Sequence, residues 1–172
     1  MEKRTIHSKN LFKKADVLVN NPTIVIAYQI KTPENIGNII RLADNAGCKM
    51  VIIATDDENI RISKVRKTAG LSFDSMPWEI CPTSEIFNKI PEDYKIVSVE
   101  TSSDSENIFI SHLPQKVAII VGNESAGIDN DVLNRSDLIV HIPLFGHNTS
   151  MNVSHALAVA LFEWQRQHFF IS

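Results

Sequence analysis

The sequence predicts an α/β domain with a mostly parallel sheet and helices on both faces. Apolar runs rich in β-branched residues recur along the chain, and amphipathic helical patterns separate most of them. Strands covered on both faces need such nearly continuous apolar runs. Strands that alternate with helices are typical of parallel sheets. In addition, three loops that follow predicted strands are rich in asparagine, serine and glycine.

The composition indicates one globular domain. The chain has 172 residues, of which 44% are hydrophobic and 22% charged, with a net charge of −3. We therefore expect a single domain over residues 1–172, in which residues 1–21 form an N-terminal extension with helical potential. Cys48 and Cys81 stand in no C-x-x-C pattern, and no apolar run is long enough for a signal peptide or a transmembrane helix. We expect a cytoplasmic protein without a membrane partner.

Five runs are predicted to form the buried strands, and helical patterns lie between and after them. The predicted strands are residues 23–30, 50–54, 95–100, 117–122 and 138–143. The predicted helices lie within residues 32–47 and over residues 59–69, 83–90, 129–135 and 151–169.

The first helix has a buried stripe and an unusual polar side. Its predicted buried residues are Ile36, Ile39, Ile40, Ala43 and Ala46. Thr32 is placed to cap the helix, and Asn38, Arg41 and Asn45 share the opposite side. That side is either a solvated face or a surface for phosphate and ribose oxygens. Gly37 costs about 1 kcal/mol relative to alanine within a helix, which indicates that something approaches the backbone closely here.

Three loops follow predicted strands, namely residues 28–38, 121–129 and 142–152. The carboxyl ends of parallel strands are where ligands bind in such sheets, so the loops predict one site. The second loop, VGNESAG, lacks both a dinucleotide fingerprint and a phosphate-loop lysine. Two residues separate Gly122 from Ser125 where a nucleophile elbow has one, which disfavours a serine hydrolase. Glu124 is therefore either a functional carboxylate exposed by the turn or a simple cap of it.

The third loop leads into the last helix, which we expect Ser150 to cap. Its backbone groups and its serine and asparagine side chains suit an adenosine-like ligand that is uncharged or zwitterionic. His147 and His155 have no cysteine or acidic companion at ligand spacing, so no metal site is predicted.

Together the three loops resemble the signature motifs of the SpoU (TrmH-like) family of SPOUT RNA 2′-O-ribose methyltransferases. The matching residues are 35–43, 120–128, 142–144 and 150–156. The resemblance implies S-adenosylmethionine as methyl donor, a ribose 2′-hydroxyl of RNA as acceptor, and a homodimer. It also implies a SPOUT-type fold with a C-terminal trefoil knot, which periodicity alone could not have indicated.

The resemblance also implies site residues by position. The catalytic candidates are Arg41, Asn35, Glu124, Ser150 and Asn152. The cofactor-binding candidates are Val99, Gly122, Ile142, Leu144, Ser150 and Met151. The family's arginine is described as a general base. Since a guanidinium is hard to deprotonate, orienting the hydroxyl and stabilising the developing alkoxide are physically easier roles for Arg41.

Basic clusters offer candidate RNA contacts. The cluster in residues 61–70 contributes Arg61, Lys64, Arg66 and Lys67, and a second cluster is KNLFKK at residues 9–14. Each is either a phosphate track or a solvated helix face. By analogy with compact family members, we expect transfer RNA more than ribosomal RNA. The alternatives are a non-catalytic RNA-binding protein and, less in keeping with the motifs, a dehydrogenase-like nucleotide-binding enzyme, which would need a glycine fingerprint and an acidic ribose partner.

Overall fold

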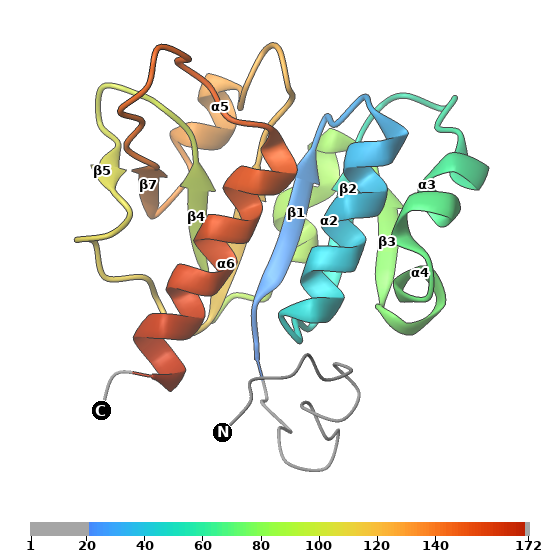
Figure 1. Ribbon diagram of the computed structural model, residues 1–172, viewed down its shortest axis with the longest axis horizontal. Helices are drawn as coiled ribbons and strands as arrows, with labels where there is room; N and C mark the ends of the chain where they lie inside the picture. Colours follow the sequence, from blue (N-terminus) through green and yellow to red (C-terminus); the bar gives the residue numbers. More distant parts are fainter. Residues whose placement is uncertain (1–20, 171–172) are drawn as a thin grey trace, which may run out of the picture.

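A computed structural model describes residues 21–170, which form an α/β fold around a seven-stranded sheet (Figure 1). The strands are β1 (Ile24–Tyr28), β2 (Met50–Ala54), β3 (Trp78–Cys81), β4 (Lys95–Val99), β5 (Glu106–Asn107), β6 (Val117–Val121) and β7 (Leu138–His141). Their order in the sheet is β3-β2-β1-β6-β4-β7-β5, and every neighbouring pair is parallel. The predicted fold class is confirmed, and the trefoil knot stays a prediction.

Helices cover both faces of the sheet. They are α2 (Pro33–Asn45), α3 (Ile62–Ala69), α4 (Ser72–Ser75), the 3₁₀ helix η1 (Thr83–Lys89), α5 (Asn130–Leu133) and α6 (Val153–Phe169). One buried cluster joins the sheet to α2, α3, α4 and α6, and a second joins it to η1 and α5. None of these helices has the length and apolarity to cross a bilayer, a finding that concerns residues 21–170 only.

Strand β1, in the interior of the sheet, shows why the predicted runs are so apolar. Val25 and Ala27 point into the first cluster, whereas Ile24 and Ile26 point into the second. All four side chains are at most 1% exposed. A strand with helices on both sides buries both of its faces, so its sequence does not alternate between apolar and polar residues.

The sequence missed two strands, and several predicted boundaries were wrong. The two missed strands, β3 and β5, lie at the two edges of the sheet, and β5 has only two residues. In β3 the charged Glu79 interrupts the apolar run, and Ile80 beside it is 45% exposed. The helix predicted over residues 59–69 begins at Ile62, because the Asp57 side chain accepts from the backbone N–H of Asn59 and holds a turn there. The predicted N-terminal extension lies outside the described residues except for Asn21, and so does the KNLFKK cluster.

Helix α2 has the predicted buried stripe, since all five of its expected residues are at most 3% exposed. Thr32 stands at the predicted N-cap position, but its side chain makes no capping bond. Its backbone carbonyl instead accepts from the N–H groups of Asn35 and Ile36. The close approach at Gly37 is confirmed, and what approaches is helix α3. A Cβ atom on Gly37 would lie 2.6 Å from Cβ of Thr68 and 2.7 Å from the carbonyl oxygen of Val65. Gly37 therefore serves helix packing rather than ligand binding.

Replacing Gly37 by alanine should destabilise the protein. Alanine gains about 1 kcal/mol in helix propensity, but forcing α2 and α3 apart costs about 1–3 kcal/mol. Because one of the clashing atoms belongs to the α3 backbone, we expect a net loss of about 1–2 kcal/mol in the free energy of unfolding, measured with urea. Gly146→Ala is the control, since no atom lies within 4 Å of a Cβ there. A Gly37→Ala variant more stable than the wild type would contradict the packing role.

Candidate active site

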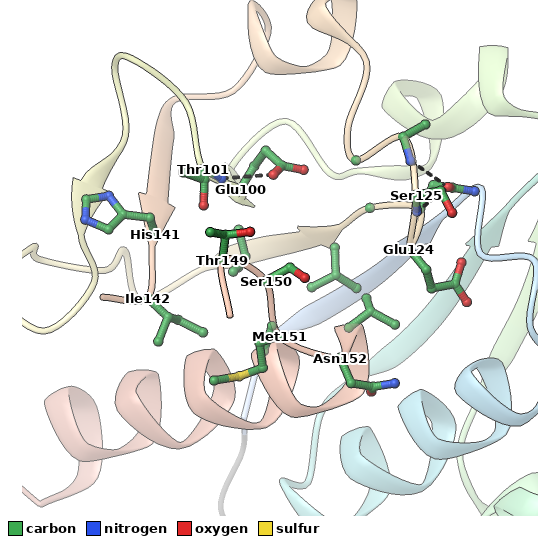
Figure 2. Close-up of a pocket in the computed structure, with 18 of the residues that line it drawn as sticks. Glu100, Thr101, Glu124, Ser125, His141, Ile142, Thr149, Ser150, Met151 and Asn152 are labelled. Atoms are coloured by element: carbon green, nitrogen blue, oxygen red, sulfur yellow. Dashed lines mark hydrogen bonds between the residues drawn. The ribbon is translucent and has the colours of Figure 1, made fainter. Parts of the chain in front are cut away.

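A cavity of about 500 Å³ is lined by two of the three polar loops, and all three loops meet beside it at the carboxyl ends of the strands (Figure 2). They follow β1, β6 and β7, and β4 lies between β6 and β7. Their carboxyl ends are therefore neighbours although they are far apart in sequence. The cavity is lined by the end of β4, the turn after β6 and the segment that joins β7 to α6. Its volume lies within the range of about 300–1,000 Å³ that is typical of small-molecule pockets.

The turn after β6 is built on two glycines and a buried asparagine. A Cβ atom on Gly122 would lie 2.5 Å from the Ile128 side chain, and Gly127 has a φ of +72°. The Oδ1 atom of Asn123 accepts from the backbone N–H groups of Ser125 and Ala126, at 2.8 and 2.9 Å. Its Nδ2 atom donates to the carbonyl of Gln29 at 2.7 Å, which ties the turn to the end of β1.

A chain of side-chain hydrogen bonds joins the three loops. Asn35 donates through Nδ2 to Oε1 of Glu124 at 2.8 Å, and Asn152 donates through Nδ2 to Oδ1 of Asn35 at 3.2 Å. The Oδ1 atom of Asn152 accepts from the backbone N–H of Ser154 at 2.9 Å. Asn152 is thus the N-cap of α6, and the prediction that Ser150 caps this helix is wrong. Helix α6 begins at Val153 because the capping oxygen lies one residue before it.

Besides accepting from the Asn35 side chain, Glu124 also binds the backbone just before α2. Its carboxylate accepts from the backbone N–H groups of Lys31 and Thr32, each at 3.3 Å. Partial burial acts to raise the pKa of Glu124, but the hydrogen bonds from Asn35 and these backbone groups outweigh it and lower the pKa below its ordinary value of 4.5. Glu124 is therefore a charged acceptor at neutral pH.

Most of the predicted site residues come together. The cavity lining includes Val99, Gly122, Glu124, Ile142, Leu144, Ser150, Met151 and Asn152. Asn35 is not in the lining, but it bonds to two residues that are. Arg41 is different: it is exposed, it does not line the cavity, and it makes no hydrogen bond or ion pair with any residue of the described range 21–170. It lies on the outer side of α2, about 9 Å along the axis from Asn35 by helix geometry.

Of the four predicted RNA-contacting cations on or just before α3, two form ion pairs and two do not. Lys64 forms an ion pair with Glu34 at 3.3 Å, and Arg66 pairs with Asp74 at 2.9 Å. The Arg66 guanidinium also stacks on the ring of Phe73. Arg61 and Lys67 have no such partner within residues 21–170, so they remain available to a ligand.

Sequence reasoning missed one charged group of the cavity. Glu100 lines the cavity directly after β4, and Figure 2 shows it beside Thr101. The prediction treated Glu100 as the last residue of its strand, yet an acidic residue at the carboxyl end of a parallel strand is itself a signal for a ligand site. Neither lysine nor arginine occurs in the described part of the lining. The described residues also hold no group of three or more side chains suited to a metal ion.

Because hydrogen bonding lowers the pKa of Glu124, its contribution to stability should depend on pH. A depressed pKa contributes stability above the ordinary value of 4.5, and that stability is lost as the pH falls through the folded-state pKa. We expect Glu124→Gln to lower the urea midpoint at pH 7 and to differ less from the wild type near pH 3. Glu58→Gln, an exposed glutamate outside the network, controls for the loss of one charge. A difference that is independent of pH would contradict this role.

Comparison with known proteins gives a consistent family. A sequence model described as the SpoU rRNA methylase family matches residues 22–162. Over 147 residues the chain is 34% identical to the 23S rRNA (guanosine-2′-O-)-methyltransferase RlmB of Blochmanniella floridana, covering 85% of this chain and 58% of that protein. Over 164 residues it is 30% identical to the tRNA (guanosine(18)-2′-O)-methyltransferase of Saccharomyces cerevisiae, covering 91% and 11%. The chain spans about three-fifths of the length of the 23S rRNA relatives.

Solved structures agree with the sequence relatives. The SpoU methyltransferase AviRb from Streptomyces viridochromogenes superimposes with a TM-score of 0.77 at 26% identity, covering 92% of this chain and 64% of that one. An AdoMet-bound rRNA methyltransferase from Sinorhizobium meliloti superimposes with a TM-score of 0.76 at 25% identity, covering 86% and 57%. Since the family model spans most of the chain, and side chains of all three motifs are hydrogen-bonded to one another beside one cavity, this protein belongs to the SpoU rRNA methylase family.

Proposed function

We propose that the protein is an S-adenosylmethionine-dependent RNA methyltransferase that methylates a ribose 2′-hydroxyl, acting in the cytoplasm. The observation that carries the proposal is the hydrogen-bonded chain of Glu124, Asn35 and Asn152 beside the cavity. It brings together polar residues from all three family motifs in one place. The names of the 23S rRNA and transfer RNA relatives support the same reaction.

The cavity suits S-adenosylmethionine in size and chemistry. The residues proposed to hold it are Val99, Gly122, Ile142, Leu144, Ser150 and Met151, which all line the cavity. A cavity that has carboxylates and, in its described lining, no lysine or arginine favours a zwitterionic or cationic ligand over a nucleotide phosphate. When bound, the cofactor supplies an electrophilic methyl group on a positively charged sulfonium. A related rRNA methyltransferase is known with AdoMet bound, which supports the assignment.

Arg41 is proposed to act on the RNA rather than on the cofactor. A guanidinium offers a planar fork to a phosphate and stays protonated, so it orients the 2′-hydroxyl and stabilises the developing alkoxide. Positioning of this kind supplies much of the rate acceleration when the methyl donor is already reactive.

The proposed enzyme is a homodimer, which accounts for the distance of Arg41 from the cavity of its own chain. Two copies would allow Arg41 to meet an RNA bound between them. Exposed apolar side chains support an interface, since Phe145 is 97% exposed and Phe162 of α6 is 50% exposed. Light scattering tests the assembly, and a monomer at micromolar concentration would contradict it.

The proposed RNA surface runs over α2 and α3. Lys31, Arg41, Arg61 and Lys67 project from these helices or the loop before them, and none is ion-paired with a described residue. By contrast, Lys95 and Lys116 pair with carboxylates at the amino ends of β4 and β6. Backbone contacts by such cations would position the RNA without reading its sequence.

The RNA class is tested by mapping 2′-O-methyl sites in cellular RNA with and without the gene. We predict transfer RNA by family analogy, and the relatives include enzymes for both classes, so ribosomal RNA belongs in the same map. Methyl transfer to a transcript separates the enzyme from a non-catalytic RNA-binding protein. Calorimetry with S-adenosylmethionine against NAD separates it from a dehydrogenase.

Replacing Arg41 by alanine should abolish methyl transfer and spare cofactor binding. Losing a group that stabilises a developing oxyanion costs roughly 100-fold or more in rate. Because Arg41 does not line the cavity, we expect the dissociation constant of S-adenosylmethionine to change less than twofold by calorimetry. An alanine variant that methylates at nearly the wild-type rate, or that no longer binds the cofactor, would overturn the assigned role.

The salt dependence of RNA binding should identify the phosphate contacts. Each cation that neutralises a phosphate contributes about 0.7–0.9 to the slope of log K against log salt. We expect Lys67→Ala to reduce that slope by about this amount, measured by filter binding or fluorescence anisotropy. As a control, Lys116→Ala removes the same charge at the amino end of β6, away from the proposed RNA surface, and should leave the slope unchanged. Equal slopes for both variants would remove α3 from the RNA surface.

A further inference from the structure

Glu100 is a fixed carboxylate in the wall of the cavity. Its Oε1 atom accepts from the backbone N–H of Thr101 at 2.9 Å, and its Oε2 atom accepts from the backbone N–H of Ile128 at 3.0 Å. These donors belong to two different walls, the end of β4 and the turn after β6. The carboxylate is therefore held in one orientation by the backbone on both sides.

The turn after β6 is shaped to make room for this carboxylate. A Cβ atom on Gly127 would lie 2.5 Å from Oε2 of Glu100, so only glycine leaves the space that the oxygen fills. Gly127 also has a φ of +72°, a conformation that L side chains rarely adopt. The missing side chain of Gly127 therefore makes room for Glu100.

The carboxylate retains acceptor capacity that no described residue uses. An ionised carboxylate has about four lone-pair sites, and backbone donors occupy one on each oxygen. Glu100 makes no ion pair within residues 21–170, and neither lysine nor arginine stands in the described cavity lining. Each oxygen therefore keeps a free acceptor site for a donor in the cavity, from water or from a ligand.

A pair of adjacent hydroxyls matches these free sites best. Each oxygen of Glu100 can accept one more hydrogen bond, and a ribose presents two vicinal hydroxyl donors. Acidic side chains at the carboxyl end of a parallel strand bind ribose hydroxyls in dinucleotide-binding folds. We propose that Glu100 binds the ribose hydroxyls of the adenosine part of the cofactor. The assignment rests on the proposed function, and it gives the cavity the acidic ribose partner that the sequence motifs lack.

The competing hypothesis is that Glu100 has only a structural role, in which it joins the end of β4 to the turn after β6. The two roles differ in how the protein responds when the ligand loses a hydroxyl. Calorimetry with 5′-methylthioadenosine and its 2′-deoxy analogue measures that response in the wild type and in Glu100→Gln. A double-mutant cycle of this kind isolates the contact between the carboxylate and the hydroxyl from any general loosening of the cavity.

We expect removal of the hydroxyl to weaken binding about tenfold in the wild type and less than threefold in Glu100→Gln. Glu106→Gln, the same change outside the cavity lining, should retain the wild-type tenfold effect. Thermal unfolding of each variant verifies that it is folded, and Glu100→Ala provides a second variant without either acceptor.

Two outcomes would overturn the assignment of Glu100 and leave the proposed function intact. If removing the hydroxyl weakens binding equally in the wild type and in Glu100→Gln, then Glu100 has only a structural role. If Glu100→Gln weakens S-adenosylhomocysteine but not 5′-methylthioadenosine, then the carboxylate binds the amino-acid ammonium instead. A wild-type protein that binds none of these adenosine ligands would overturn the proposed function together with the assignment.

Discussion

The hydrogen-bonded chain from Glu124 through Asn35 to Asn152 is the interaction on which the site depends. It joins side chains that stand 89 and 117 residues apart in the sequence. Glu124 fixes the segment before α2, and Asn152 caps α6. The same series of hydrogen bonds therefore fixes where both helices begin. The strand order makes these contacts possible, because β1, β6, β4 and β7 lie next to one another in the sheet.

The sequence predicted the interior of the fold better than its edges. Burial on both faces requires an apolar run, and β1, β2, β4, β6 and β7 each display one. Edge strands have one hydrogen-bonded neighbour and solvent on the other side, so β3 and β5 carry no such signal. The order of the strands could not be predicted, since pairing between β1 and β6 depends on contacts about a hundred residues apart.

The site divides in a similar way. Residues within the motifs, such as Gly122, Glu124 and Asn152, could be named from the sequence because the motifs fix their positions relative to each strand end. The position of Glu100 at the end of a predicted strand was a signal that the prediction left unused. Its orientation could not be predicted, since it depends on the backbone N–H of Ile128 and on the missing side chain of Gly127. Gly37 is the opposite case, because the sequence indicated a close approach and the approaching group is α3 rather than a ligand.

Charge is segregated in a way that the net value of −3 conceals. The described cavity lining has the carboxylates of Glu100 and Glu124 and neither lysine nor arginine, whereas Arg41, Arg61 and Lys67 lie on α2 and α3. Under the proposed function, these two regions face ligands of opposite charge, a cationic sulfonium and an anionic RNA backbone. The placement of charge, and not its sum, therefore governs which molecules a mildly acidic protein binds.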